Sequence, residues 1–124
     1  MADYVNVPPE QAAELIKNGE CYVIDVRTEE EYLSHRIPGA YLLPVQEIHQ
    51  RHGEIPKNPD RKLLFVCEHG IRSVHTCMAL SKAGWNNVVN MSGGMAEWLD
   101  CKLPCSSGET RDGVNLGPKC EAGS

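Results

Sequence analysis

The sequence predicts a three-layer α/β domain, in which helices flank a parallel five-stranded sheet. Two observations support this prediction. Short apolar runs recur along the chain, and segments of helical period, bounded by prolines, glycines and capping residues, separate them. Strands that alternate with helices are typical of parallel sheets covered by helices on both faces. The length of 124 residues suits one such domain.

The strands are expected where apolar, β-branched and aromatic residues gather in short runs that end in polar or turn residues. These runs are residues 4–7, 21–24, 40–43, 63–66 and 88–91. The run 63–66 is continuously apolar, which is typical of a strand buried on both faces. Cys21 begins the second run, and we interpret it as a packing residue because free cysteines are among the most buried residue types.

The helices are expected between these strands. Their segments are residues 10–17, the stretch after Thr28, residues 45–50, the stretch from Ser73 to Gly84, and residues 95–99. Thr28 and Glu31 have the spacing of a capping box, which predicts the start of the second helix. Ser73 is expected to be the N-cap of the fourth helix, and Gly84 is expected to stop it.

A polar loop that carries a thiol joins the fourth strand to the fourth helix. It consists of Cys67, Glu68, His69, Gly70, Ile71, Arg72 and Ser73. Because Cys67 follows a buried strand and faces a helix N-terminus, free backbone N–H groups and the positive end of the helix dipole favour an anion there. The guanidinium of Arg72 adds to this preference for the thiolate, which is the nucleophilic form of cysteine. We therefore interpret Cys67 as a nucleophile and not as a core cysteine.

Three stretches of the sequence resemble the rhodanese family of sulfurtransferases. The first is the loop itself, in which four residues separate Cys67 from Arg72, whereas the related cysteine-dependent phosphatases carry one residue more. A smaller ring of N–H groups suits a single sulfur atom better than a tetrahedral phosphoryl group. The other two stretches are residues 25–40, which begin Asp-Val-Arg and end His-Arg-Ile-Pro-Gly-Ala, and Gly93-Gly94 followed by Trp98.

This resemblance implies a single-domain sulfurtransferase. Cys67 would take a sulfane sulfur from thiosulfate or a persulfide donor and pass it to a thiol or cyanide acceptor, with Arg72 orienting and neutralising the anion. The backbone N–H groups that would bind the transferred sulfur belong to Glu68, His69, Gly70, Ile71 and Ser73. No metal or organic cofactor is expected. The expected partners are a small-molecule or protein sulfur donor and a thiol acceptor.

Side chains in and beside the loop bear on its substrate and its support. Glu68 is acidic and His69 is mostly neutral, whereas an enzyme specialised for thiosulfate would present positive charge at these positions. Weak affinity for this dianion is therefore expected. Asp25 and Arg27 would support the loop, since ligand sites gather at the carboxyl ends of parallel strands. A structural ion pair of Arg27 with Glu30 or Glu31 is the simpler and favoured interpretation.

Two other functions suit the same scaffold. The first is a cysteine-dependent phosphatase or arsenate reductase, but the spacing of Cys67 and Arg72 and the absence of a nearby general-acid motif oppose it. The second is a non-catalytic rhodanese-like binding module, a class that usually lacks the nucleophile that this sequence retains. A thiosulfate–cyanide turnover assay separates the three functions.

The composition excludes several classes of partner. A net charge of −5 provides no basic stripe, so nucleic acid is not an expected partner. No apolar stretch approaches membrane-spanning length and the first residues do not resemble a signal peptide, so no membrane partner is expected and a cytoplasmic location is predicted. The six cysteines are then expected to be reduced.

The composition shifts after residue 103. Residues 1–103 are expected to form the domain, and residues 104–124, rich in loop formers, a flexible tail. Cys105 and Cys120 on this tail are candidate resolving thiols for a persulfide on Cys67. The alternatives are bystander thiols, which are favoured, a disulfide between the two, and a metal site that includes Cys101. The metal site ranks last because the close cysteine pairs of common zinc sites are absent.

Overall fold

A computed structural model describes residues 4–57 and 59–108 of the protein. Its strands form one sheet, in which every pair of neighbouring strands is parallel. They are β1 (Val5–Val7), β2 (Cys21–Asp25), β3 (Tyr41–Leu42), β4 (Lys62–Val66) and β5 (Val88–Met91). Their order across the sheet is β1-β5-β4-β2-β3, so β4 lies at the centre. The predicted parallel five-stranded sheet is confirmed.

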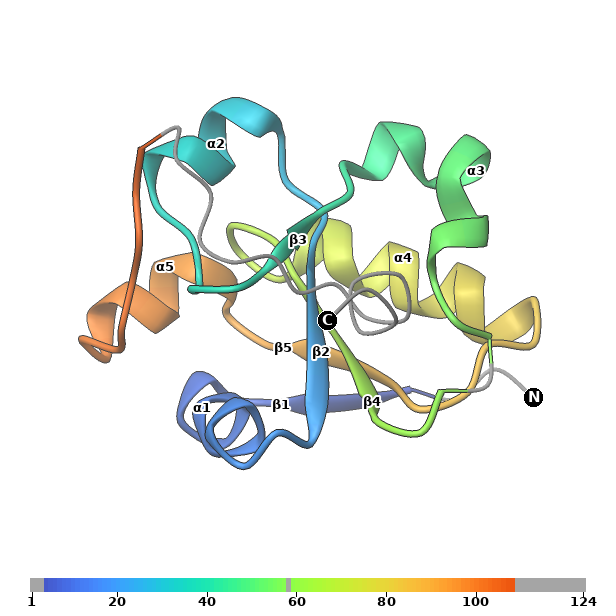
Figure 1. The fold of residues 1–124 in the computed structure, drawn as a ribbon, viewed down its shortest axis with the longest axis horizontal. Helices are drawn as coiled ribbons and strands as arrows, with labels where there is room; N and C mark the ends of the chain where they lie inside the picture. The colour runs from blue at the N-terminus through green and yellow to red at the C-terminus, as the bar shows by residue number, and fades with distance from the viewer. Residues whose placement is uncertain (1–3, 58, 109–124) are drawn as a thin grey trace.

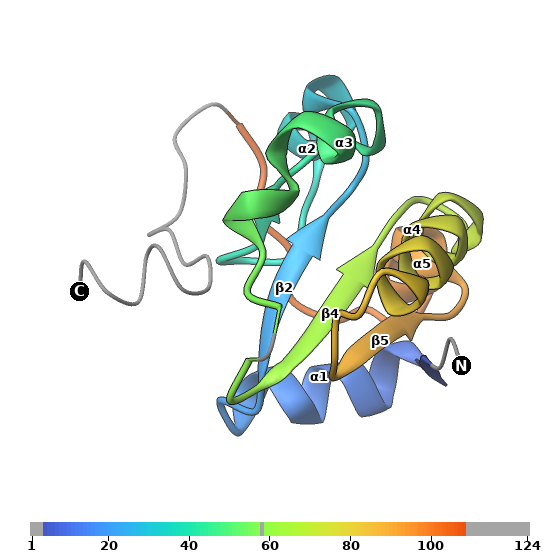
Figure 2. The ribbon, with the colours of Figure 1, turned by 90° about the vertical axis from the view of Figure 1, so that its right-hand side faces the viewer.

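Helices cover both faces of this sheet (Figures 1 and 2). They are α1 (Pro9–Lys17), α2 (Glu29–Ser34), α3 (Ile48–Arg51), α4 (Ile71–Lys82) and α5 (Gly94–Asp100), with 3₁₀ turns η1 (Val45–Glu47) and η2 (His52–Glu54) on either side of α3. One buried apolar cluster joins the sheet to α1, α2 and α5, and a second joins it to α3 and α4. The three-layer architecture is confirmed, whereas the helix expected over 45–50 is one helical turn between two 3₁₀ turns.

The side chains of β4 alternate between the two layers. Leu64 and Val66 belong to the cluster with α1 and α5, and Leu63 and Phe65 belong to the cluster with α4. Because successive side chains of a strand point to opposite faces, Cys67 continues this alternation toward α4. The register of the central strand therefore decides which helix the thiol faces.

The helices α2 and α4 begin in different ways. At α2, Thr28 Oγ1 accepts the N–H of Glu31 at 3.2 Å and the Glu31 carboxylate accepts the N–H of Thr28 at 3.0 Å, so the predicted capping box is confirmed. At α4, the prediction of Ser73 as N-cap is wrong, because the helix begins at Ile71 after Gly70, whose φ is +87°. Glycine adopts this left-handed backbone readily, and the chain turns into the helix earlier than expected.

The segment after α5 returns to the body of the domain, and Figure 1 shows it running from α5 to α2. Trp98 Nε1 donates to the carbonyl of Pro104 at 2.8 Å, and Arg36 and Ser106 exchange two backbone hydrogen bonds of 2.9 Å. Arg36 Nη1 also donates to the carbonyl of Gly108 at 3.0 Å. Residues 104–108 are thus held at several points, which differs from the flexible tail expected there. Residues 109–124, and Cys120 with them, lie outside the described residues.

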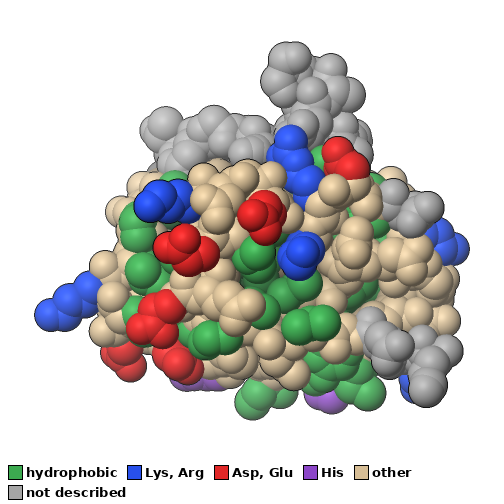
Figure 3. All heavy atoms as spheres, turned by 90° about the horizontal axis from the view of Figure 1, so that it is seen from below, with side chains coloured by type: hydrophobic (Ala, Val, Ile, Leu, Met, Phe, Trp, Pro, Cys, Tyr) green, Lys and Arg blue, Asp and Glu red, His purple; other side chains and the backbone are tan. Residues whose placement is uncertain are grey.

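The surface mixes charged and apolar side chains. On the face seen from below in Figure 3, Lys and Arg side chains lie among acidic and apolar ones and form no continuous stripe. In the part of the chain that the structure describes, no helix combines the length and the apolar character needed to cross a membrane.

Candidate active site

Cys67 lies at the carboxyl end of β4, directly before the loop that enters α4. It is buried, with 1% of the residue exposed. Two backbone N–H groups donate to Sγ, from Gly70 at 3.0 Å and from Ser73 at 3.4 Å. Because the first N–H groups of a helix have no acceptor within it, α4 directs partial positive charge at the sulfur. The loop is therefore built to hold a negatively charged group at this position.

The start of α5 holds the outer side of this loop. The N–H of Met95 donates to the carbonyl of Cys67 at 2.8 Å, and the N–H of Ala96 donates to the carbonyl of Glu68 at 2.9 Å. Each peptide group points its N–H opposite to its C=O, so these bonds turn the next two N–H groups of the loop away from α5. A Cβ on Gly94 would lie 2.5 Å from both of these carbonyl oxygens. Glycine at position 94 therefore allows the backbone of α5 to approach the loop closely.

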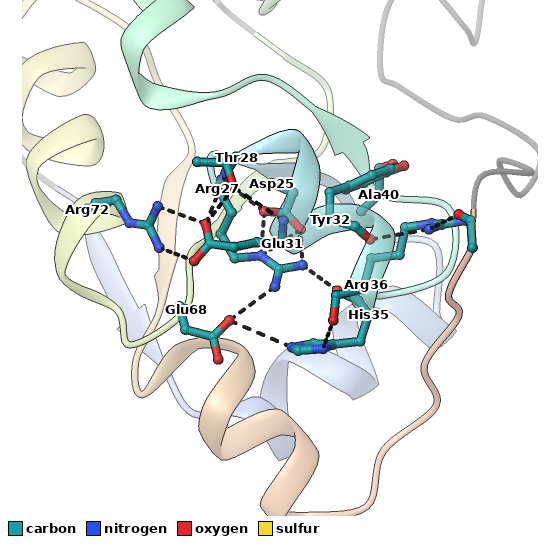
Figure 4. A network of polar contacts seen from close by, with 12 residues as sticks. Asp25, Arg27, Thr28, Glu31, Tyr32, His35, Arg36, Ala40, Glu68 and Arg72 are labelled. Carbon is teal, nitrogen blue, oxygen red and sulfur yellow. Dashed lines mark hydrogen bonds and ion pairs between the residues drawn. The ribbon is translucent and has the colours of Figure 1, made fainter.

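A buried ion pair at the end of β2 reaches the loop from the other side (Figure 4). Arg27 and Asp25 are fully buried, and Nε and Nη2 of Arg27 donate to the carboxylate at distances of 2.9 to 3.2 Å. Nη1 of Arg27 donates to the Glu68 carboxylate at 3.1 Å, and Nη2 donates to the carbonyl of His35 at 2.6 Å. Burial raises the pKa of Asp25, and the hydrogen bonds from Arg27 oppose that rise. Arg27 thus joins the end of β2 to the second residue of the loop.

Arg72, expected to neutralise an anion at Cys67, forms a second ion pair (Figure 4). Its Nη1 and Nη2 donate to the two carboxylate oxygens of Glu31, each at 2.9 Å. The prediction that Arg27 pairs with Glu30 or Glu31 is therefore wrong: Arg27 pairs with Asp25 and Glu68, and Glu31 pairs with Arg72. The hydrogen bonds from Arg72 lower the pKa of Glu31 to about 2. The same bonds raise the pKa of Arg72, and the negative charge that Cys67 carries when it is ionised raises it further. The guanidinium thus lies within electrostatic reach of Cys67 while α2 holds it.

A chain of polar side chains behind Cys67 was not expected from the sequence. Ser73 Oγ lies 3.3 Å from Sγ of Cys67, and its hydroxyl donates to Oδ1 of Asn90. Nδ2 of Asn90 in turn donates to Oδ1 of Asn6 at 3.0 Å. Ser73 and Asn90 are almost fully buried, whereas Asn6 is exposed. The signal in the sequence was the asparagine inside an otherwise apolar strand, since a buried amide in such a strand needs a partner.

Comparison with known proteins identifies the family. Residues 8–101 match the model of the rhodanese-like domain. The chain belongs to the rhodanese family. A sulfurtransferase from Allochromatium vinosum is 38% identical over 82 residues, which cover 66% of this chain and 75% of that protein. A thiosulfate sulfurtransferase from Actinobacillus succinogenes is 30% identical over 113 residues, which cover 90% of this chain and 96% of that protein.

The fold comparison agrees with the family. A crystal structure of a rhodanese-related protein from Thermoplasma volcanium superposes with a TM-score of 0.76 at 27% identity, covering 83% of this chain and 98% of that one. Relatives that are named sulfurtransferases are thus similar to this chain in sequence, and a rhodanese-related protein shares its fold.

The rim of the rhodanese loop is formed by exposed side chains. Ile71 is 65% exposed and His69 is also exposed, so these residues frame the site and their side chains point to solvent. Nε2 of His35 lies 3.7 Å from the Glu68 carboxylate, on the side where Arg27 also reaches it. The exposed side of the loop therefore carries the apolar side chain of Ile71 beside charged and polar groups.

The other described thiols differ from Cys67 in their surroundings. Burial raises the pKa of Cys21 to about 11 and that of Cys77 to about 12, so both remain thiols near neutral pH. Partial burial and the neighbouring Glu10 raise the pKa of Cys101 as well. Cys105 is exposed. Among residues 4–57 and 59–108, no group of three or more His, Cys, Asp or Glu side chains is arranged to bind a metal ion.

Proposed function

We propose that this rhodanese domain is a sulfurtransferase in which Cys67 carries the transferred sulfur as a persulfide. The observation that supports this proposal most directly is the buried Sγ, which accepts N–H groups of Gly70 and Ser73 at the N-terminus of α4. A group held in this way is favoured when it bears negative charge, and both a thiolate and a persulfide bear it.

The reaction has two balanced halves. The Cys67 thiolate attacks the outer sulfur of thiosulfate, the S–S bond of the donor breaks, and sulfite leaves with the electron pair. An acceptor thiolate then attacks the outer sulfur of the Cys67 persulfide, and the Cys67 thiolate leaves. The enzyme alternates between two stable forms, so ping-pong kinetics are expected. Cyanide replaces the thiol in the same second step and leaves as thiocyanate.

The loop residues have separate roles in this scheme. The N–H groups of residues 68–73 hold the outer sulfur by fixed dipoles, in the manner of an oxyanion hole. Asp25 and Arg27 act as supports, because Arg27 bonds the Glu68 carboxylate from a fully buried position. Arg72 provides the positive charge nearest the donor anion, although Glu31 holds it when no donor is bound.

Several observations favour sulfur transfer over the alternatives. The relatives from Allochromatium vinosum and Actinobacillus succinogenes are sulfurtransferases. The spacing of Cys67 and Arg72 provides a smaller ring than the cysteine-dependent phosphatases have, and the retained nucleophile opposes a purely binding role. The described cysteines are free thiols, which suits a reducing compartment, and we propose the cytoplasm. The partners are then a sulfur donor and a thiol acceptor.

Mass spectrometry tests this proposal. After incubation with thiosulfate or a low-molecular-weight persulfide, the wild type is expected to gain one sulfur on the peptide that contains Cys67. Cys67→Ser is expected to gain none, and Cys77→Ser serves as the matched control because it removes a buried thiol outside the loop. An undiminished gain of sulfur in Cys67→Ser would refute the assignment.

A further inference from the structure

We infer that Glu31 makes the reactivity of Cys67 depend on the charge of the reagent. Its carboxylate already accepts the N–H groups of Arg72 that an anionic reagent would otherwise use. This inference names the donor preference of the proposed sulfurtransferase and so rests on that function where it concerns sulfur donors. Its electrostatic part concerns the thiol of Cys67 alone and does not require sulfur transfer.

The pair has the geometry of a bound anion. Nη1 and Nη2 of Arg72 each donate to a different carboxylate oxygen of Glu31 at 2.9 Å, which is the bidentate arrangement that guanidinium groups prefer. Oε1 of Glu31 also accepts the N–H of Thr28 at 3.0 Å and its hydroxyl at 3.3 Å. The start of α2 therefore presents the carboxylate to Arg72 in a fixed position.

The pair is also accessible. The side chain of Arg72 is 35% exposed and that of Glu31 is 33% exposed, whereas Arg27 is fully buried beneath Asp25 and Glu68. A solute that approaches Cys67 can therefore meet the Arg72 guanidinium but not that of Arg27. An anionic donor that uses Arg72 must compete with the Glu31 carboxylate for the same N–H groups.

The charges around the loop do not favour a dianion. Three carboxylates, on Asp25, Glu31 and Glu68, are bonded to two guanidinium groups, on Arg27 and Arg72, so the surroundings carry a net negative charge. Weak affinity for thiosulfate is expected from residues 68–69, and the Glu31 carboxylate in α2 is a second cause of it. Removing the Glu31 charge leaves two carboxylates and two guanidinium groups, and it frees Arg72 to bind the anionic sulfur donor.

The chain offers a clean substitution. Glutamine performs the same capping role as glutamate at the third helical position, so Glu31→Gln keeps the capping box of α2 and removes the carboxylate from Arg72. Glu30→Gln removes the same charge from the neighbouring exposed position and is the matched control. Arg72→Gln, alone and combined with Glu31→Gln, completes a double-mutant cycle that isolates the part carried by Arg72.

The first measurement needs no sulfur transfer. Cys67 is alkylated with iodoacetate, which is an anion, or with iodoacetamide, which is neutral, and the rate at the peptide that contains Cys67 is followed by mass spectrometry. We expect Glu31→Gln to raise the ratio of the iodoacetate rate to the iodoacetamide rate about threefold to tenfold at low salt, and less at high salt. Glu30→Gln is expected to change the ratio less than about twofold, and Glu31→Gln is expected to have little effect when Arg72→Gln is already present.

The second measurement uses two sulfur donors that differ by one charge. Glu31→Gln is expected to lower the KM for thiosulfate, a dianion, by a factor similar to the change in the alkylation ratio. The KM for an aromatic thiosulfonate, a monoanion, falls less, and kcat changes little for either donor. A purely structural role for Glu31 predicts parallel losses with both donors and an unchanged alkylation ratio.

The outcomes separate the two proposals. If neither donor places sulfur on Cys67 while the alkylation ratio rises, the proposed sulfur transfer fails and the charge selectivity stands. If sulfur loads onto Cys67 but the ratio and the KM values are the same in Glu31→Gln and Glu30→Gln, the selectivity assigned to Glu31 is overturned.

Discussion

At the scale of single residues, the direction of the Ser73 hydroxyl determines how many hydrogen bonds the sulfur of Cys67 accepts. This hydroxyl lies 3.3 Å from Sγ but donates to the buried amide of Asn90, so Gly70 and Ser73 reach the sulfur with backbone N–H groups alone. Asn90 therefore acts as a positioning residue, because it draws a donor away from the thiolate. A hydrogen bond to a charged group contributes about 1.5–3 kcal/mol, so this choice affects reactivity.

The first prediction follows from that competition. Asn90→Leu releases the Ser73 hydroxyl, which then donates to Sγ, and the rate of alkylation of Cys67 by iodoacetamide at pH 7 is expected to rise at least about threefold. Ser73→Ala alone is expected to change the rate less than about twofold. In the double variant the gain from Asn90→Leu should vanish, and a gain that persists without the hydroxyl would contradict the assignment.

At the scale of elements, the contact between α5 and the loop limits one backbone position to glycine. Gly94 has a φ of +62°, and a Cβ there would lie 2.5 Å from backbone atoms of residues 67–68, which cannot move without moving the nucleophile. Gly19 has a similar φ of +69°, but nothing lies within 4 Å of its Cβ position. The two glycines thus separate the cost of backbone conformation from the cost of a clash.

The second prediction compares these two positions. Gly19→Ala is expected to cost about 1 kcal/mol of unfolding free energy in urea and to leave sulfur loading of Cys67 unchanged. Gly94→Ala is expected to cost more than about 2 kcal/mol and to slow sulfur loading at least tenfold, because the loop is displaced. Equal effects of the two variants on sulfur loading would remove the role assigned to the α5 contact.

The third prediction concerns the ion pair that joins α2 to α4. The pKa of Glu31 is lowered from its ordinary 4.5 to about 2, chiefly by hydrogen bonds from Arg72. The folded state therefore binds the proton less readily than the unfolded state, and the pair contributes stability that is complete above pH 4.5 and is lost as the pH falls through 2. Because the pair is about one-third exposed, we expect Glu31→Gln to cost only about 0.5–1 kcal/mol at pH 7.

Urea unfolding at several pH values checks this sign. The difference between the wild type and Glu31→Gln should narrow steadily as the pH is lowered from 5 toward 2. Glu30→Gln, on the same turn of α2, should show no comparable trend. A difference that grows on acidification would contradict the assigned direction.

The scale of the whole molecule explains which features the sequence could predict. Cys67, Gly70 and the start of α4 follow one another along the chain, so the strand, the thiol and the helix after them were predictable from local pattern, although the N-cap is Gly70 and not Ser73. The contacts of Arg27 with Glu68 and of Arg72 with Glu31 each join residues 41 positions apart, and Ser73 meets Asn90 over 17 positions. Those contacts depend on the strand order β1-β5-β4-β2-β3, which periodicity does not encode.

The chain beyond α5 illustrates the same limit. Residues 104–108 have the composition of a flexible tail, yet Ser106 pairs with Arg36 and the N–H of Gly108 donates to the carbonyl of Leu33 at 2.8 Å. Arg36 is fully buried, so the segment is anchored on an ordered side chain. Of the two candidate resolving thiols, Cys105 lies between two anchored neighbours, so Cys120 is the candidate that remains.

The last prediction tests the two candidate resolving thiols, Cys105 and Cys120, separately. Cys105 lies between Pro104, whose carbonyl accepts the indole N–H of Trp98, and the bridged Ser106, so it cannot travel to Cys67 without breaking both contacts. Cys105→Ser is therefore expected to leave the lifetime of the Cys67 persulfide unchanged within about twofold when no external thiol is present. Truncation after Gly108 keeps the anchored segment and removes Cys120; if Cys120 discharges the persulfide, this truncation lengthens that lifetime while leaving sulfur loading intact. Equal lifetimes in the truncated and full-length proteins would exclude the tail from the chemistry, and a longer lifetime in Cys105→Ser would mean that the anchored segment opens during turnover.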